Sequence, residues 1–169
     1  MKAGNGIRRA AAVVLAVMMA MAVVPVAMAA EKKEQQYAFT YKEQQITVGM
    51  AADTALKAFG KENKVKTLAN CADDNGKDKA YIYDDFEVII TKEGKKEVVQ
   101  SIRLTSGNVG TEEGIKVGDL PAAVKKAYPD AKEEAGLYTV VLGDSQLVID
   151  CGFKNDKVVE ICYEAAGKK

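Results

Sequence analysis

Two phrases, Ile46-Thr47-Val48-Gly49 and Ile115-Lys116-Val117-Gly118, decide the fold that this sequence predicts. In each phrase apolar residues alternate with other residues, and the alternation stops at a glycine. A run with helical spacing follows each glycine, ending at Ala58-Phe59-Gly60 in the first case and at Ala127-Tyr128-Pro129 in the second. Alternation, glycine and helical spacing predict a strand, a turn and a short helix. The chain therefore contains the same predicted strand–turn–helix pattern twice.

Both predicted helices are short. The first is expected over residues 51–59, where apolar residues recur at spacings of three and four, and Gly60 is a suitable stop. The second is expected over residues 119–128, with Asp119 as its N-cap and Pro129 as its end. Its apolar stripe is Leu120, Val124, Ala127 and Tyr128.

Antiparallel strands are predicted around these helices. Alternating aromatics at Tyr37, Phe39 and Tyr41, followed by Ile46 and Val48, predict an N-terminal hairpin. The stretch 62–79 has little regularity and contains an Asn-Gly turn. Alternation and turn residues then predict three strands in each half of the chain, at 79–84, 86–91, 98–104, 137–142, 146–153 and 157–163.

We therefore predict an α+β fold with an N-terminal hairpin strand and two tandem units, each a short helix followed by an antiparallel meander. The last strands of the units correspond at an offset of 59, residue 99 with residue 158. The predicted organisation is a signal peptide 1–29, a flexible lead 30–36, unit one 37–105, a connector 106–114, unit two 115–164 and a tail 165–169.

The first 29 residues have the pattern of a secretory leader. Lys2, Arg8 and Arg9 form a basic start, an apolar run follows, and Ala27-Met28-Ala29 is a cleavage signal. The alternative is an uncleaved membrane anchor, since about twenty apolar residues can span a bilayer. We expect a secreted or cell-envelope protein that meets a membrane only if the leader is uncleaved.

The charge of the chain argues against nucleic acid as a partner. Removal of the leader takes away three of 24 basic residues and none of 24 acidic ones, which leaves 21 − 24 = −3. A weakly acidic chain without a basic patch lacks the electrostatic footprint that nucleic-acid binding requires.

The sequence contains few of the residue patterns that support catalysis or metal binding. It contains no histidine, which removes Ser-His-Asp and Cys-His mechanisms and histidine metal sites. The acidic stretch 73–78 fails the spacing of a calcium-binding EF-hand loop, since Gly76 comes too early. We expect a protein that is not an enzyme and has no cofactor.

Three cysteines, Cys71, Cys151 and Cys162, allow one intramolecular disulfide in an exported chain. If Ile149, Cys151 and Ile161 point inward, Cys162 points the other way, so Cys151 and Cys162 are not expected to bridge each other. A bridge would join Cys71 to one of them. The alternative is three reduced, buried cysteines.

The order of elements, together with the phrases Val48-Gly49-Met50, Asn70-Cys71-Ala72, Lys79–Tyr83 and Thr111–Gly118, resembles known proteins. It is similar to the β-lactamase-inhibitor-protein-like (BLIP-like) tandem-repeat architecture and to uncharacterised secreted proteins of Gram-positive anaerobes. The resemblance implies a fold. No functional residue of the inhibitor family is matched, and none is carried over.

Candidate interaction residues are Tyr81 and Tyr83 on a predicted strand and Asp73 and Asp74 in the loop beside Cys71. Tyrosine is enriched at interface hot spots, although strand aromatics also serve as core residues. We predict a non-catalytic protein that binds an extracellular protein through a sheet face or loops. The alternative is a proteinaceous inhibitor or immunity-like module of an extracellular enzyme.

Overall fold

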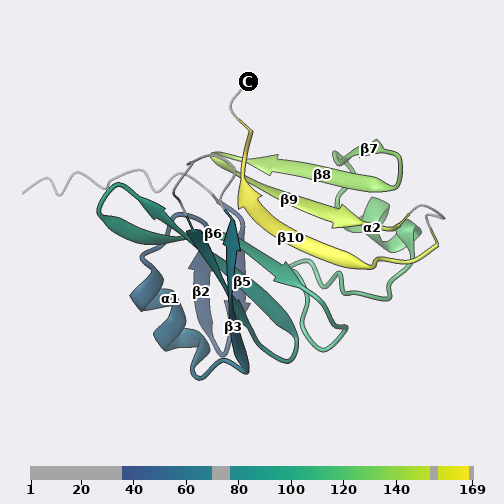
Figure 1. Cartoon of the computed structure of the whole chain (residues 1–169). Coiled ribbons are helices and arrows are strands. Elements are labelled where there is room, and N and C mark those ends of the chain that lie inside the picture. Colours follow the sequence, from purple (N-terminus) through teal and green to yellow (C-terminus); the bar gives the residue numbers. More distant parts are fainter. Residues whose placement is uncertain (1–35, 70–76, 153–155, 168–169) are drawn as a thin grey trace, which may run out of the picture. The chain divides into compact units, whose positions relative to one another are not determined.

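A computed structural model describes residues 36–69, 77–152 and 156–167 (Figure 1). It contains two short helices, a two-stranded hairpin and one eight-stranded antiparallel sheet. The predicted α+β class is confirmed. The predicted leader, the lead up to residue 35 and the loop that contains Cys71, Asp73 and Asp74 lie outside the described residues.

The N-terminal hairpin is confirmed, with β1 at Ala38–Tyr41 and β2 at Gln44–Thr47. Tyr41 pairs with Gln44, so only Lys42 and Glu43 form the connection. Both have positive φ, 47° and 67°. This is the backbone of a type I′ turn, which usually takes Asn-Gly, and two ordinary side chains occupy it here.

Helix α1 at Ala52–Phe59 agrees with the prediction. Ala52, Ala55 and Phe59 form its buried side. Gly60 ends the helix at φ 81° and ψ −153°, a backbone region that is essentially open only to glycine. The sequence signal of a terminal glycine was sufficient here because the stop is a local backbone effect.

The eight-stranded sheet joins the two halves of the chain edge to edge. Its strand order is β3-β4-β5-β6-β10-β9-β8-β7, and every neighbouring pair is antiparallel. The first half supplies β3 (Lys64–Ala69), β4 (Lys77–Ile82), β5 (Phe86–Glu93) and β6 (Lys96–Leu104). The second half supplies β7 (Lys132–Glu134), β8 (Leu137–Leu142), β9 (Ser145–Asp150) and β10 (Glu160–Ala165).

The prediction of three strands per unit is wrong, because β3 and β7 were missed. Both are end strands, and their residues are exposed except for the half-buried Leu68. Main-chain pairing with β4 and β8 forms them rather than burial of an apolar face, so the sequence shows no clear alternation. The stretch 62–79, predicted to have little regularity, therefore contains β3 and the first residues of β4.

Helix α2 at Pro121–Ala127 starts later than predicted. Leu120 is its N-cap residue, without a side-chain cap, and Asp119 instead accepts a hydrogen bond from the Lys116 N–H at 2.8 Å. Of the predicted stripe, Val124 and Tyr128 are buried, whereas Leu120 is 59% exposed. The Asp119 carboxylate closes the preceding turn and is not available as the cap.

The two halves meet at β6 and β10 in a register that fits the predicted offset. Arg103 pairs with Cys162, which is its equivalent at an offset of 59. Each half contributes one helix and four strands of the large sheet, and the first half also contributes the hairpin. Whether the halves arose by duplication stays a prediction.

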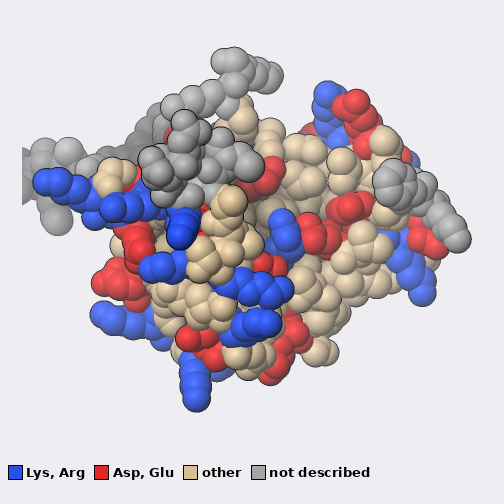
Figure 2. Space-filling model, in the orientation of Figure 1, with Lys and Arg blue, Asp and Glu red and all other residues tan. Residues whose placement is uncertain are grey.

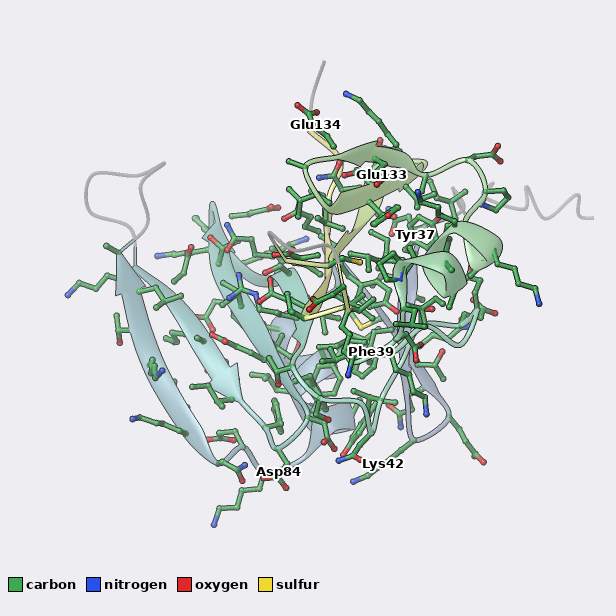
Figure 3. The ribbon with its side chains drawn as sticks, turned by 90° about the vertical axis from the view of Figure 1, so that its right-hand side faces the viewer. Tyr37, Phe39, Lys42, Asp84, Glu133 and Glu134 are labelled. Atoms are coloured by element: carbon green, nitrogen blue, oxygen red, sulfur yellow. The ribbon has the colours of Figure 1, made fainter. Side chains whose placement is uncertain are left out.

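The core lies on one side of the sheet. The hairpin, α1, α2 and the inward residues of the sheet form one apolar cluster (Figures 1 and 3). Phe39 lies between the hairpin and the sheet, with its ring centroid 5.1 Å from that of Phe86 and 6.0 Å from that of Tyr163. Fully buried members of the cluster include Phe39, Phe86, Leu104, Tyr138, Leu147 and Ile161.

Candidate interaction surface

The side of the sheet opposite the core is the candidate site, and we call it the open face. Side chains alternate between the two sides of a strand. In β6, Ile102 and Leu104 belong to the core cluster, so Ser101 and Arg103 point the other way. The register extends this assignment across the sheet. The open face includes Lys64, Lys66, Leu68, Asp78, Ala80, Ile82, Glu87, Ile89, Ser101, Arg103, Lys132, Glu134, Leu137, Thr139, Val141, Gln146, Val148, Asp150, Glu160, Cys162 and Glu164.

Charged groups of both signs occupy the centre of the open face. Arg103 Nε lies 3.1 Å from Glu160 Oε1, and both side chains are 39% exposed. The contact is an ion pair without the alignment of a hydrogen bond. At this exposure it stabilises the fold by only about 0–1 kcal/mol. Figure 2 shows acidic and basic residues interleaved on the molecular face in view.

A groove of about 530 Å³ crosses the open face on the side of the first half of the chain. Asp78, Glu87 and Glu164 contribute carboxylates to its lining, and Arg103 contributes the positive charge. Leu68 and Ile89 add apolar surface. The groove is therefore mixed in polarity, which suits a protein surface better than a small apolar ligand.

The second half of the chain contributes an apolar area to the same face. Leu137 is 41% exposed and Val141 is 59% exposed. Both lie on β8, on the same side as Thr139, which pairs with the half-buried Val148 of β9. Thr139 lies between them on this side, and Leu137 pairs with Glu134 and Asp150. Exposed apolar side chains bordered by charges are typical of interaction sites.

Of the two tyrosines predicted as interaction residues, Tyr83 is buried and Tyr81 is half-buried. Tyr83 is 9% exposed and stacks on Phe86 with the ring centroids 4.7 Å apart. Burial raises the pKa of Tyr83 to about 12. The prediction is wrong for Tyr83, because the residue completes the aromatic cluster with Phe59. Tyr81 is half-buried and packs against the core cluster from β4, on the side away from the open face.

The other strand aromatics are core residues as well. Phe39, Tyr138 and Tyr163 are buried, and Tyr37 and Tyr41 are half-buried against the same cluster. The described strands therefore do not present a face lined with exposed tyrosines. In Figure 3, Phe39 lies inside while Lys42 and Asp84 lie at the opposite end from Glu133 and Glu134.

Cys151 and Cys162 are both buried, and neither is bridged to another described residue. Burial raises the pKa of Cys162 to about 11, and Glu164 acts in the same direction while Arg103 opposes it. Burial and Asp150 raise the pKa of Cys151. Both thiols stay protonated near neutral pH and are poor nucleophiles. Cys71 lies outside the described residues, so its pairing with Cys151 or Cys162 stays a prediction.

A buried phenol pair lies on the core side near the connector. The Tyr128 hydroxyl donates a hydrogen bond to the Glu113 carboxylate, whereas the Tyr163 hydroxyl has no hydrogen-bond partner. Burial is the main cause that raises the pKa of both phenols, and Glu113 adds to it. Neither group is near the open face.

No set of three or more potential metal ligands occurs within 36–69, 77–152 and 156–167. Of the acidic stretch 73–78, only Lys77 and Asp78 are described, and Asp78 is 7% exposed on the open side of β4. In the same ranges, no helix has the length and apolar character needed to cross a membrane.

The sequence matches no protein-family model and no curated protein. An extracellular protein containing an SCP domain from Bacillus anthracis str. Ames matches in structure, with a TM-score of 0.51 and 12% sequence identity, over 74% of this chain and 49% of that one. A cysteine-rich secretory protein from Staphylococcus aureus subsp. aureus Mu50 matches with a TM-score of 0.45 and 14% identity, over 69% of this chain and 44% of that one. The first match shows a similarity of fold, and the chain spans about half the length of that protein.

The predicted resemblance to BLIP-like proteins and to uncharacterised secreted proteins of Gram-positive anaerobes is wrong. The fold is shared instead with part of an extracellular protein that contains an SCP domain. The motifs that suggested the resemblance are strand ends, glycine turns and helix stops. Such strand ends, turns and helix stops determine the local backbone conformation. They recur in unrelated α+β folds, so they do not identify a family.

Sequence reasoning singled out neither Leu137 and Val141 nor Arg103 and Glu160. A signal for them existed in the alternation of the predicted strands. Once Ile102 and Leu104 are taken as core residues, Arg103 must point away from the core. In 137–142 both sides of the strand carry apolar residues, with Thr139 as the exception on the open side, and this is unusual for a sheet with one solvated face.

Proposed function

We propose that this protein is a non-catalytic binding protein of the cell exterior that holds another protein on its open face. The observation that carries the proposal is the exposure of Leu137 (41%) and Val141 (59%) on the side of the sheet away from the helices. A solvated sheet face ordinarily carries polar residues. The extracellular origin of the Bacillus anthracis protein and the leader-like N-terminus support the cell exterior as the location.

The composition of the open face favours a protein as the partner. An apolar area beside interleaved charges is the arrangement of a protein interface, in which the apolar part supplies affinity and the charges supply specificity. The proposal also includes the absence of enzymatic activity. It is supported by the lack of histidine and by the raised pKa values of Cys151 and Cys162, which make these two thiols poor nucleophiles.

Two substitutions of the same kind test the proposal. Val141→Glu introduces a charge on the open face, and Leu120→Glu introduces the same charge at a residue that is also 59% exposed but precedes α2 on the helix side. Neither side chain is buried, so both variants should keep the fold. The tagged mature chain, incubated with culture supernatant and cell-wall extract of its source, should retain one main protein.

Val141→Glu should lose at least nine-tenths of that protein and Leu120→Glu should lose little. Equal retention by both variants and by the parent would contradict a binding role for the open face. If the retained protein is a single enzyme whose activity falls in the presence of the chain, the partner is an enzyme and the inhibitor alternative is favoured.

A further inference from the structure

Strand β3 leaves one edge of the sheet open. Each of its residues, Lys64 to Ala69, pairs with β4 on one side, and β3 is the last strand in the sheet order of the described residues (Figure 1). An end strand has unpaired N–H and C=O groups along its outer side, which can bind an extended peptide as an added strand. The question is which peptide fits this edge.

The open-face side of β3 carries the positive charges of Lys64 and Lys66. Lys64 and Lys66 point to that side, because they pair with Ile82 and Ala80. Both are exposed, and none of the ion pairs between described residues includes either of them. Asp84, near the start of the strand, accepts a hydrogen bond from the Asn63 side chain at 2.6 Å.

The other side of β3 carries an apolar row that reaches the edge. Val65 is 43% exposed and pairs with Tyr81, which in turn pairs with the buried Val88. A strand added outside β3 would place one of its side chains next to Val65. An apolar, β-branched side chain would extend this row, and acidic side chains on the opposite side would face Lys64 and Lys66.

A second copy of this chain does not fit the edge well. Two antiparallel β3 strands centred on Val65 would bring Lys64 of each copy opposite Lys66 of the other, and like charges directly opposite each other destabilise a sheet. The other end strand, β7, has only three residues. Its Glu133 contacts Lys125 at 2.8 Å and its Glu134 contacts Lys132 at 3.7 Å, so their charges are already compensated.

We propose that β3 binds an extended segment of another protein in which acidic residues alternate with β-branched apolar residues. The segment adds a ninth strand to the sheet, with main-chain hydrogen bonds to β3 and with its carboxylates beside Lys64 and Lys66. This site is the edge of the sheet and does not depend on binding at the open face.

A direct test uses a blocked seven-residue peptide, acetyl-Glu-Val-Glu-Thr-Glu-Val-Glu-amide, with the full mature chain. Titration followed by NMR should show saturable binding and slowed hydrogen exchange of amides in β3. Lys64→Glu combined with Lys66→Glu should weaken binding at least tenfold. Lys95→Glu combined with Lys96→Glu changes the net charge by the same amount at the β5–β6 turn and should leave binding within twofold of the parent.

Two comparisons separate strand addition from simple charge attraction. A peptide with the same sequence but N-methylated at alternate residues cannot pair along one edge and should not bind. Binding should persist in Val141→Glu, since that residue lies on β8. Failure of the parent chain to bind the peptide, equal binding of the N-methylated peptide, or equal loss in the turn variant would overturn the proposal, and the lysines would then serve only to prevent aggregation at this edge.

Discussion

At the scale of single residues, two buried phenols in similar surroundings have opposite hydrogen-bonding states. The Tyr128 hydroxyl donates to Glu113, and the Tyr163 hydroxyl is buried without a partner. An unpaired buried polar group costs about 1–3 kcal/mol, whereas a hydrogen bond to a charged group stabilises by a comparable amount. The two tyrosines therefore form a matched pair for mutation.

We predict that Tyr163→Phe leaves the free energy of unfolding unchanged or raises it by about 1 kcal/mol, because it removes the unpaired hydroxyl. Tyr128→Phe should lower it by about 1 kcal/mol, because Glu113 loses its donor. Urea unfolding at pH 7 measures both. A clear destabilisation by Tyr163→Phe would show that its hydroxyl has a partner that the structure lacks.

The raised pKa values predict how stability depends on alkaline pH. An unfolded tyrosine ionises near pH 10, whereas burial keeps Tyr128 and Tyr163 protonated above that pH in the folded state. Above about pH 10 the unfolded chain alone loses these protons, so stability falls as pH rises. Removal of one such group by Tyr163→Phe should reduce the slope by about 1.4 kcal/mol per pH unit. An unchanged slope between pH 10 and 11.5 would contradict this assignment.

The hairpin turn offers another test at this scale. Lys42 and Glu43 hold positive φ without being glycine or asparagine, and such residues each cost about 1 kcal/mol or more. Replacing them by Asn and Gly (Lys42→Asn with Glu43→Gly) should raise the free energy of unfolding by about 1 kcal/mol. Thermal and urea unfolding measure the gain, and a loss would show that the two side chains make contacts that outweigh the strain.

At the scale of elements, the hairpin is held to the sheet by Phe39. Its ring lies within 6.2 Å, centroid to centroid, of the rings of Tyr41, Phe59, Phe86 and Tyr163. It is fully buried, so Phe39→Ala should cost about 3–5 kcal/mol and expose the hairpin to exchange with solvent. Thr40→Ala, at an exposed residue of the same strand, is the control and should change stability by less than about 0.5 kcal/mol. Hydrogen exchange of β1 and β2 measures both.

The elements that could be predicted from the sequence are those whose formation is local or buries a clear stripe. The hairpin, α1 and the strands β5, β6 and β8 have alternating or helical patterns that reach the core. Strands β3 and β7 are formed by main-chain pairing with an exposed edge, and the alternation that would predict them is absent. The predicted role of Asp119 was also wrong. Its carboxylate accepts a hydrogen bond from the Lys116 N–H in a turn instead of capping α2.

At the scale of the whole molecule, the alternation of apolar residues could be seen in the sequence, but the side of the sheet that the hairpin and helices cover could not be predicted from it. That choice depends on where the hairpin and both helices pack, and all of them belong to the same core cluster. Tyr83 was taken as an interface residue because its strand pattern is the same for a core and a surface position. Leu137 and Val141 were passed over because an apolar run predicts burial on both sides of the strand.

The central claim is that a partner protein binds the open face, and site-specific photo-crosslinking tests it most directly. A photo-reactive residue is placed at Val141 in one preparation and at Leu120 in another, both 59% exposed in the parent chain. Each is irradiated in cell-wall extract of the source. The account predicts a single major adduct from position 141 and none of the same mass from position 120. An adduct of equal yield from both positions, or from position 120 alone, would contradict it.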